Sequence, residues 1–254
     1  MDIRLDGKVA LVTGASTGIG AAIAIAFARA GAQLAIHYNR SAAEAEKVAA
    51  AIRSDGAHEP LVVKADVLDG QAIRDMVRVV KDRFGRIDIL VNNAGGLLER
   101  RSVEDMPDDD YARVMELNLG STFRVSRCVI PIMKKSGGAI INLSSIAARN
   151  GGSDGATLYA TSKAAVSTLT RGMAKELAPF GIRVNAIAPG IVLTPFHDKY
   201  TSPEALKKLI ASIPLGRAAT AEEIAGPALF LASERLSSFI TGEILEVNGG
   251  SLMA

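Results

Sequence analysis

The sequence predicts an α/β fold: a single doubly wound, Rossmann-type sheet of seven parallel strands with helices on both faces. Short apolar runs alternate with stretches of helical periodicity, which is typical of strands joined by crossover helices. The runs are almost continuously apolar, as expected for strands covered on both faces. A glycine-rich turn separates the first run from the first helix. The 254 residues, 48% of them hydrophobic, suit one large α/β unit.

The elements follow one another in regular order. The predicted strands cover residues 9–12, 34–38, 61–63, 87–91, 139–143, 183–188 and 244–247, and the helices roughly 18–30, 42–54, 69–84, 108–134, 157–179, 203–211 and 221–232. Gly31 and Gly181 suit the left-handed residue past a helix end. Residues 150–158 and 194–202 have the least regular pattern. We expect one domain over 1–254, with a cofactor half at about 1–140 and a catalytic and substrate half at about 141–254.

Composition excludes several classes of protein. A net charge of +2 gives no case for a nucleic-acid or anionic-membrane partner. Cys128 is the only cysteine, so no intrachain disulfide forms, and the first residues lack the apolar core of a secretory signal. We expect a cytoplasmic protein without a membrane span. The acidic run 108–110 indicates a helix start, where the helix dipole favours negative charge, and we expect no metal site.

The turn after the first strand is the strongest local motif. Thr13-Gly14-Ala15-Ser16-Thr17-Gly18-Ile19-Gly20 leads from a strand into a helix. Glycines let the backbone approach a pyrophosphate, and the helix start offers free N–H groups to it. The spacing is G-x-x-x-G-x-G rather than the common G-x-G-x-x-G, and a glycine-rich turn alone is weak support, because tight turns need glycine for steric reasons.

The same turn has a competing interpretation. Residues 14–18 match G-x-S-x-G, the nucleophile elbow of α/β-hydrolases. In a hydrolase several strands normally precede the elbow, whereas here only one does, and no His-Gly-Gly-Gly oxyanion segment occurs. Of the histidines that follow, neither His58 nor His197 lies in a suggestive setting. The dinucleotide interpretation is therefore favoured.

The end of the second strand bears on the choice between NAD and NADP. An NAD site places an acid there to bind the ribose 2′-hydroxyl. Here the stretch 37–41 contains no acid, and the first one is Glu44 in the next helix. Arg40 can pair with a 2′-phosphate and Ser41 can donate to it, so NADP is favoured over NAD. Arg40 as a solvated loop charge is the alternative, because Thr17 is neutral where a second basic residue would have strengthened the case.

The candidate catalytic residues lie in the second half of the chain. Tyr159 and Lys163 are four residues apart, so they lie on one face of a helix. A nearby cation favours a phenolate and moves the Tyr pKa towards the working range. Ser144 and Ser145 follow the fifth strand, at the end where ligands bind in such sheets, and a hydroxyl there can hydrogen-bond a carbonyl. Each feature alone also fits a structural role.

Taken together, the motifs resemble those of the short-chain dehydrogenase/reductase family. They are Thr13-Gly14-x-x-x-Gly18-Ile19-Gly20, Asn92-Asn93-Ala94-Gly95, Asn118, Ser145, Tyr159-x-x-x-Lys163 and Pro189-Gly190. The resemblance implies that Tyr159 donates and accepts the proton and that Ser145 orients the carbonyl. Lys163 would hold the nicotinamide ribose and lower the Tyr pKa. Asn118 would anchor a water in the proton relay.

The cofactor residues follow from the motifs and the resemblance. They are Gly14, Ser16, Thr17, Gly18, Ile19 and Gly20 in the turn, Tyr38, Asn39, Arg40 and Ser41 after the second strand, Asp66 and Val67 at the adenine, Asn93, Ala94 and Gly95 along the dinucleotide, Tyr159 and Lys163 at the ribose, and Pro189, Gly190, Ile191, Val192 and Thr194 at the carboxamide end. Residues 97–100, 147–158 and 195–213 are expected to shape the substrate pocket.

Within the family the chain is similar to bacterial 3-oxoacyl-carrier-protein reductases, most clearly from Pro214-Leu215-Gly216-Arg217 to Val247-Asn248-Gly249-Gly250. Ser136 and Phe180 stand where those reductases tend to carry basic residues for the acidic carrier protein, which makes that partner doubtful. A sugar or polyol dehydrogenase is the alternative within the family. A dinucleotide-binding sensor without turnover is the alternative outside enzymes, although it has no need for the catalytic residues. The resemblance implies a homotetramer.

Overall fold

A single parallel sheet forms the centre of the molecule. The structure is a computed structural model that describes residues 3–253, with the backbone alone for residues 197–199. All seven strands are parallel, in the order β3-β2-β1-β4-β5-β6-β7. They are β1 Val9–Val12, β2 Gln33–Tyr38, β3 Leu61–Lys64, β4 Ile89–Asn92, β5 Gly138–Leu143, β6 Ile182–Pro189 and β7 Ile244–Val247. The predicted fold class is confirmed, and each strand lies within two residues of its predicted ends.

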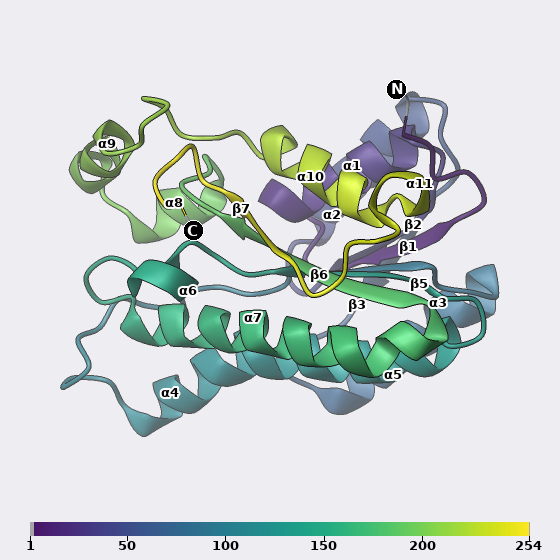
Figure 1. Ribbon diagram of the computed structural model, residues 1–254, viewed down its shortest axis with the longest axis horizontal. Helices are drawn as coiled ribbons and strands as arrows, with labels where there is room; N and C mark the ends of the chain where they lie inside the picture. The colour runs from purple at the N-terminus through teal and green to yellow at the C-terminus, as the bar shows by residue number, and fades with distance from the viewer. Residues whose placement is uncertain (1–2, 254) are drawn as a thin grey trace.

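Helices cover both faces of the sheet. They are α1 Gly18–Arg29, α2 Ala42–Ser54, α3 Gly70–Phe84, α4 Asp108–Met115, the π-helical turn η1 Glu116–Gly120, α5 Ser121–Met133, α6 Ala147–Asn150, α7 Thr157–Leu177, the 3-10 turn η2 Ala178–Phe180, α8 Pro195–Tyr200, α9 Pro203–Ala211, α10 Glu222–Ala232 and α11 Glu234–Ser237. In Figure 1, α1 and α10 lie on one side of the sheet and α5 and α7 on the other. Phe27 of α1 and Met133 of α5 are fully buried in the two resulting cores.

Several local features differ from the sequence-based expectation, and the short helices α6 and α11 have no counterpart among the predicted helices. The helix expected over 108–134 is interrupted by η1, where Asn118 turns its side chain inward and donates to the carbonyl of Val114. The segment 194–202, expected to be irregular, contains α8, which begins with Pro195 at a position that suits proline. A helix as short as α8 contains too few residues for helical periodicity to be seen in the sequence.

The strand order changes direction at β1: β2 and β3 are added on one side of β1, and β4 to β7 on the other. The connections after β1 and β4 therefore leave in opposite directions, which opens a crevice at the carboxyl ends of these two neighbouring strands. Side chains tie the two loops there together. The hydroxyl of Thr13 accepts the N–H groups of Asn93 and Ala94 at 3.0 and 3.1 Å, and the amide of Asn93 donates to the carbonyls of Thr13 and Gly14 at 2.9 Å each. The glycine-rich turn is thus fixed against the loop after β4.

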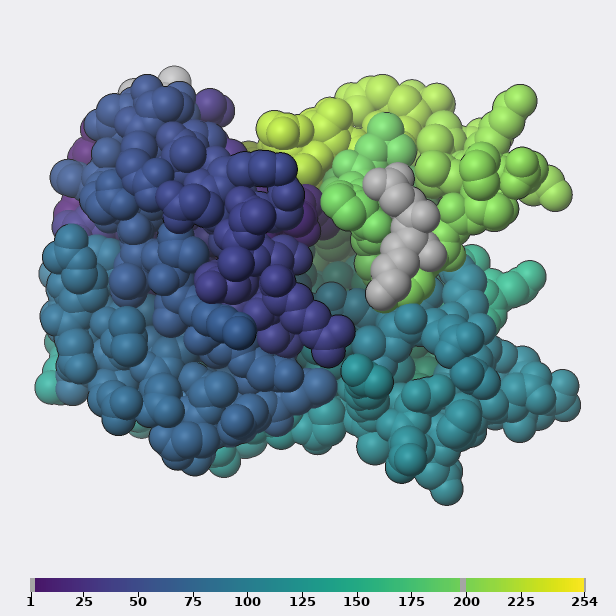
Figure 2. Space-filling model, turned by 180° about the vertical axis from the view of Figure 1, so that it is seen from behind, coloured from purple at the N-terminus to yellow at the C-terminus, as the bar shows by residue number. Residues whose placement is uncertain are grey.

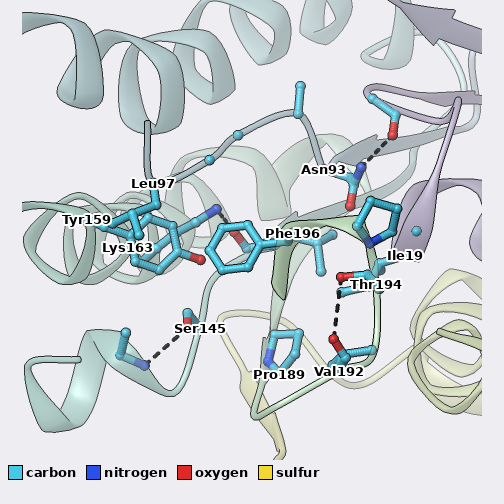
Figure 3. Close-up of a pocket in the computed structure, with 18 of the residues that line it drawn as sticks. Ile19, Asn93, Leu97, Ser145, Tyr159, Lys163, Pro189, Val192, Thr194 and Phe196 are labelled. Carbon is cyan, nitrogen blue, oxygen red and sulfur yellow. Dashed lines mark hydrogen bonds between the residues drawn. The ribbon is translucent and has the colours of Figure 1, made fainter. Parts of the chain in front are cut away.

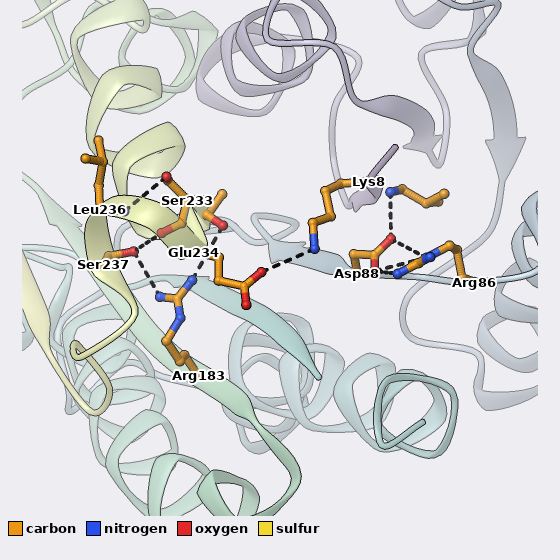
Figure 4. Close-up of polar contacts among 10 residues, drawn as sticks. Lys8, Arg86, Asp88, Arg183, Ser233, Glu234, Leu236 and Ser237 are labelled. Atoms are coloured by element: carbon orange, nitrogen blue, oxygen red, sulfur yellow. Dashed lines mark hydrogen bonds and ion pairs between the residues drawn. The ribbon is translucent and has the colours of Figure 1, made fainter. Parts of the chain in front are cut away.

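Paired polar groups lie at the opposite end of the sheet, around a smaller cavity of about 270 Å³ (Figure 4). Asp88, only 2% exposed, accepts the N–H of Val9 at 2.9 Å and the Nε–H of Arg86 at 2.8 Å. Arg183 donates to the carbonyl of Leu231 and the hydroxyl of Ser237 at 2.9 and 3.0 Å. A buried charge needs such partners, and these groups are satisfied by the protein itself. The crevice at the other end is therefore the place to look for a ligand.

No helix within residues 3–253 has the length and apolar character needed to cross a membrane.

Candidate active site

A pocket of about 690 Å³ opens at the carboxyl ends of the central strands. It runs from the turn after β2, where Arg40 lies, past the start of α1 to Tyr159 on α7 and Phe196 on α8. Figure 2 shows the surface hollowed between the purple, early part of the chain and the green segment that contains α8. The pocket thus joins the segments predicted to bind a dinucleotide with those predicted to shape a substrate site.

The glycine-rich turn is packed too tightly for side chains at two of its glycines. Gly14 has a φ of +63°, and a Cβ there would lie 3.1 Å from the Cα of Ala94. A Cβ on Gly20 would overlap the carbonyl of Gly14 and the amide of Asn93. These two glycines therefore allow the first turn of α1 to approach the loop after β4. Gly14 and Gly18 also line the pocket.

The start of α1 offers donors to an anion. The N–H groups of the first helical residues, Gly18, Ile19 and Gly20, have no partner within the helix, since the bond from Ala21 to the carbonyl of Thr17 is the first that the α-helical pattern allows. The side chain of Thr17 makes no capping bond. Free N–H groups and the positive end of the helix dipole favour a phosphate at this place.

The turn after β2 adds a positive charge. Arg40 is exposed, lines the pocket and forms no ion pair with any carboxylate that the structure describes. Ser41 precedes α2, and its hydroxyl makes no capping bond. Among the described residues that line the pocket, none is Asp or Glu. Both side chains are thus free to meet a phosphate.

Ser145, Tyr159 and Lys163 converge inside the pocket (Figure 3). Tyr159 and Lys163 lie on successive turns of α7, with the Lys163 ammonium 5.8 Å from the centre of the Tyr159 ring. The hydroxyl of Ser145 accepts the N–H of Ala147 at 3.1 Å, and its interaction with the phenol lowers the pKa of Tyr159. The Lys163 ammonium is buried and donates to the carbonyl of Leu143 at 2.7 Å. The three predicted side chains are therefore brought together.

Burial dominates the protonation of this group. It raises the pKa of Tyr159 to about 12, against a smaller lowering by the hydrogen bond from Ser145. It also lowers the pKa of Lys163 to about 8. Withdrawal of the phenol from water is the larger cause, and the expected lowering of the Tyr159 pKa by Lys163 stays a prediction. Tyr159 is accordingly a neutral phenol, and thus a proton donor, at neutral pH.

The two serines after β5 have different surroundings. Ser144 is buried, and its hydroxyl lies 2.7 Å from that of Ser167 and donates to the carbonyl of Lys163 at 3.1 Å. Ser144 therefore anchors β5 to α7. Ser145, the serine predicted from the sequence, is the one whose interaction with the phenol lowers the pKa of Tyr159.

Asn118 lies behind the pocket wall rather than in it. It is fully buried, donates to the carbonyls of Gly96 and Val114 at 2.9 and 3.0 Å, and accepts the N–H of Gly96 at 3.0 Å. A Cβ on Gly95 would come within 2.6 Å of its Oδ1 and 3.3 Å of the Lys163 ammonium. The contacts of Asn118 fix the loop after β4, and its predicted role in a water relay stays a prediction.

The substrate side of the pocket is mainly apolar. Leu97, Leu117, Ile146, Ala147, Ala156, Phe196 and Leu209 contribute to the wall. The ring of Phe196 lies 5.9 Å from the ring of Tyr159, so α8 packs directly against the candidate proton donor. Among the described side chains of this wall Arg100 is charged, and its guanidinium donates to the carbonyls of Tyr200 and Asp154 and to the hydroxyl of Ser153. It joins three of the surrounding loops.

Most of the predicted site residues line this pocket, and four do not. Gly20, Tyr38, Asp66 and Asn118 are outside its wall. Gly20 lies beneath the turn, Tyr38 packs on the core under α1 and α2, and the carboxylate of Asp66 accepts the N–H of Leu68. His37 lines the pocket but was not among the predicted site residues. In the sequence His37 is only one residue of the stretch 37–41, which contains no acid. Its contacts with Gly14 and Ala65 in the folded chain distinguish it from its neighbours.

The features of the pocket fit a nicotinamide dinucleotide. The turn admits backbone approach, α1 presents free N–H groups, Arg40 is available for a phosphate, and no described acid in the wall would repel one. Pro189 at the end of β6, with Gly190 and Val192 just after it, lines the same pocket as Lys163 and Tyr159, in place for the nicotinamide end. No group of three or more potential metal ligands from His, Cys, Asp and Glu occurs within the described part of the chain.

Comparisons with known proteins agree with this geometry. Residues 14–251 match the family model described as enoyl-(acyl carrier protein) reductase. The chain is 40% identical to 3-oxoacyl-[acyl-carrier-protein] reductase FabG of Thermotoga maritima over 98% of this chain and 99% of that protein. It is also 40% identical to 7alpha-hydroxysteroid dehydrogenase of Escherichia coli K12 over 99% of this chain and 96% of that protein.

A solved structure shows the same similarity. The crystal structure of a short-chain type dehydrogenase/reductase from Mycobacterium marinum superposes with a TM-score of 0.92 at 36% identity, covering 100% of this chain and 98% of that one. Sequence and structure therefore agree over almost the whole chain. The protein belongs to the short-chain dehydrogenase/reductase family of NAD(P)-dependent oxidoreductases.

Proposed function

We propose that the protein is an NADP(H)-dependent reductase of ketones with an apolar body, and that 3-oxoacyl thioesters are its leading substrate class. The observation that carries the proposal is the group of Ser145, Tyr159 and Lys163 at the meeting point of a phosphate-binding turn and an apolar wall. The reverse oxidation of a secondary alcohol uses the same groups. A sensor without turnover is less well supported, because it would not need Ser145, Tyr159 and Lys163 together in one pocket.

The side chains support reduction by proton donation. The bound dinucleotide supplies the hydride that reaches the carbonyl carbon. Ser145 and Tyr159 would donate hydrogen bonds to the carbonyl oxygen and hold it in one orientation. The proton of Tyr159 would then pass to the oxygen as negative charge develops there, since its pKa of about 12 keeps the phenol protonated at neutral pH. Lys163, buried beside the phenol, would stabilise the phenolate that is left behind.

The wall of the pocket supports the substrate class. Leu97, Ile146 and Phe196 offer apolar surface to an acyl chain, whereas a sugar needs several hydrogen-bonding partners for its hydroxyls. The similarity to an acyl reductase and to a hydroxysteroid dehydrogenase points in the same direction, because both named substrate classes have an apolar body. A sugar or polyol dehydrogenase is the alternative that the activity test must separate.

The test is the absorbance of reduced nicotinamide during incubation with a panel of 3-oxoacyl thioesters, oxo-steroids, simple ketones and sugars, each with NADPH and with NADH. We expect the highest kcat/KM for a 3-oxoacyl thioester with NADPH. Preference for a sugar would contradict the substrate class, and preference for NADH would contradict the assignment of Arg40. Absence of turnover with every compound and both cofactors, in a protein that binds them, would favour the sensor.

Arg40 gives a separate prediction about the cofactor. Arg40→Ala is expected to raise the Kd of NADPH by a factor of about 10 to 100, because it removes charge-assisted hydrogen bonds worth about 1.5–3 kcal/mol. The Kd of NADH should change by less than about threefold, since NADH has no 2′-phosphate to lose a contact. Isothermal titration of both cofactors measures this. Equal weakening of both would show that Arg40 does not read the 2′-phosphate.

Arg100 gives a prediction about the substrate side. Its guanidinium links the segment after β4 to Ser153, Asp154 and the end of α8. Arg100→Met keeps much of the apolar stem but removes these donors, each worth about 1 kcal/mol. We expect the KM of the ketone to rise about tenfold, with the Kd of NADPH unchanged.

Arg101→Met is the matched control for Arg100. Arg101 is the next residue, but its guanidinium pairs with Glu99 and Asp110, and it does not line the pocket. The control should leave the KM within about twofold of the wild type, since only a surface ion pair is lost. An equal rise of the KM in both variants would mean that the loop is perturbed in general and that Arg100 has no special role.

We propose that the protein is a homotetramer that acts on free thioesters, and the carrier-protein partner stays doubtful. Tyr111 and Phe123, 54% and 47% exposed on α4 and α5, supply apolar surface for subunit contacts. Phe180, where a basic residue would favour an acidic carrier protein, is covered by the Lys134 ammonium 3.9 Å from its ring centre. Analytical ultracentrifugation tests the tetramer, and kcat/KM with a thioester on coenzyme A against one on carrier protein tests the partner.

A further inference from the structure

His37 is a buried histidine that connects two parts of the dinucleotide site. It lies at the end of β2, is 2% exposed, and lines the pocket beneath the glycine-rich turn. Its Nδ1 accepts the N–H of Gly14 at 3.0 Å. Its Nε2 lies 3.1 Å from the carbonyl oxygen of Ala65, directly before the predicted adenine residues Asp66 and Val67. One imidazole thus spans from the phosphate turn to the loop after β3.

These two partners determine the tautomer of the ring. A backbone N–H can only donate and a carbonyl oxygen can only accept, so Nδ1 must be unprotonated and Nε2 must carry the hydrogen. Burial lowers the pKa of His37, which keeps this neutral form at neutral pH, while the Asp66 carboxylate acts weakly in the opposite direction. Protonation of Nδ1 would break the bond from Gly14.

The backbone of His37 contacts the same turn. Its carbonyl accepts the N–H of Ala15 at 2.9 Å. The N–H groups of Gly14 and Ala15 are therefore both directed at His37 and away from a ligand. The donors left for a phosphate are those from residue 16 onward and at the start of α1. His37 thereby decides which part of the turn faces the dinucleotide.

We propose that His37 is a positioning residue for the dinucleotide, and that its imidazole sets the spacing between the phosphate-binding turn and the adenine-binding loop at residues 65–67. It acts through Gly14 and Ala65 and touches no reacting atom. An apolar side chain of the same volume would fill the space but leave the N–H of Gly14 without an acceptor. An unpaired buried N–H raises the free energy of the folded protein, and a shift of the turn would lower it again. The proposal rests on dinucleotide binding alone and is independent of the ketone.

A pair of substitutions separates the two bonds of the ring. In His37→Asn, the side-chain oxygen takes about the place of Nδ1 and can still accept the N–H of Gly14, but the donor to Ala65 is lost. In His37→Gln, the longer amide reaches about the place of Nε2 and can donate to Ala65, but the acceptor for Gly14 is lost. His37→Leu removes both bonds. The three variants thus alter packing to a comparable degree and differ in which contact remains.

The measurement is the Kd of NADPH and of NADH by isothermal titration, without any ketone, together with the melting temperature of each protein. We expect His37→Asn to bind within about threefold of the wild type. His37→Gln and His37→Leu should bind about tenfold more weakly, as loss of one buried hydrogen bond to a backbone N–H implies. All three variants should melt below the wild type.

Each outcome bears on the proposal. A weaker Kd for His37→Gln than for His37→Asn at similar melting temperatures supports it, because a purely structural role would not distinguish the two. Equal affinity in all variants, or losses of affinity that follow the melting temperature alone, would overturn it and leave the ketone reductase proposal intact. Failure of the wild type to bind either dinucleotide would contradict both proposals. Turnover of ketones is not needed for any of these results.

Discussion

Tyr159→Phe is expected to lower kcat for ketone reduction by a factor of about 10² to 10⁴, the usual contribution of a positioned general acid. The substitution removes only the hydroxyl, the group whose pKa burial raises to about 12. The ring and its contact with Phe196, 5.9 Å between centres, are kept. The Kd of NADPH should therefore stay within about threefold of the wild type, and the measurement is steady-state kinetics beside isothermal titration.

A matched control uses another tyrosine of the same chain. Tyr111 is 54% exposed on α4 and does not line the pocket, so Tyr111→Phe should leave kcat unchanged. The pH dependence adds a second check. With the phenol protonated at neutral pH, kcat for reduction should not fall as the pH rises through 7, whereas a phenol with a pKa near 7 would lose its proton there. Near-normal turnover by Tyr159→Phe would rule out the proposed mechanism.

Lys163→Met is expected to lower kcat by a factor of about 10² to 10³, comparable to the loss of one preorganised donor at a site of developing charge. The Lys163 ammonium is 5.8 Å from the Tyr159 ring centre and buried, so its charge acts on the phenolate with little screening by water. Methionine keeps the length of the side chain and removes the charge. Lys175→Met, on the exposed face of the same helix, is the control and should not change kcat.

The same variant gives a prediction about stability and pH. Burial lowers the pKa of Lys163 from its ordinary 10.5 to about 8, so below pH 8 both the folded and the unfolded states hold the proton. Between about pH 8 and 10.5 the unfolded chain holds a proton that the folded protein has released. The free energy of unfolding therefore gains a contribution that rises with pH across this window, by up to about 3 kcal/mol.

Urea unfolding of the wild type and of Lys163→Met at pH 7.5, 8.5 and 9.5 measures this contribution as a difference. The wild type should gain stability relative to the variant as the pH rises, because other titrating groups are common to both. Staying below pH 10 also avoids the titration of tyrosines in the unfolded chain. A difference between the two proteins that does not change with pH would mean that Lys163 keeps its ordinary pKa in the folded state.

Much of the fold followed from local patterns in the sequence. Apolar runs of the right length marked every strand, because a parallel strand buried on both faces has few polar residues. The spacing of four between Tyr159 and Lys163 placed both on one face of α7, since that relation depends on helix geometry alone. The glycines of the first turn were equally visible, because their φ angles and close contacts exclude side chains.

Other features depended on segments far apart in the chain. The π-helical turn at Asn118 forms where that side chain donates to the carbonyls of Gly96 and Val114, and no local sequence pattern predicts such a contact. The short helix α8 lacks the length for periodicity, yet it brings Phe196 onto Tyr159. The role of Arg100 is visible only once three loops come together around its guanidinium.

The sequence by itself determined the order of the strands and of the long helices, because these are encoded by residues close together in the chain, and it predicted the dinucleotide turn and the candidate catalytic side chains. Only the tertiary structure shows that the Ser144 hydroxyl is bonded to Ser167 of α7, which leaves the predicted Ser145 to interact with Tyr159. It also decided that burial raises the pKa of Tyr159, and that His37 joins Gly14 to Ala65. Desolvation and hydrogen bonds between distant segments exist only after the chain has folded, so no local pattern contains them.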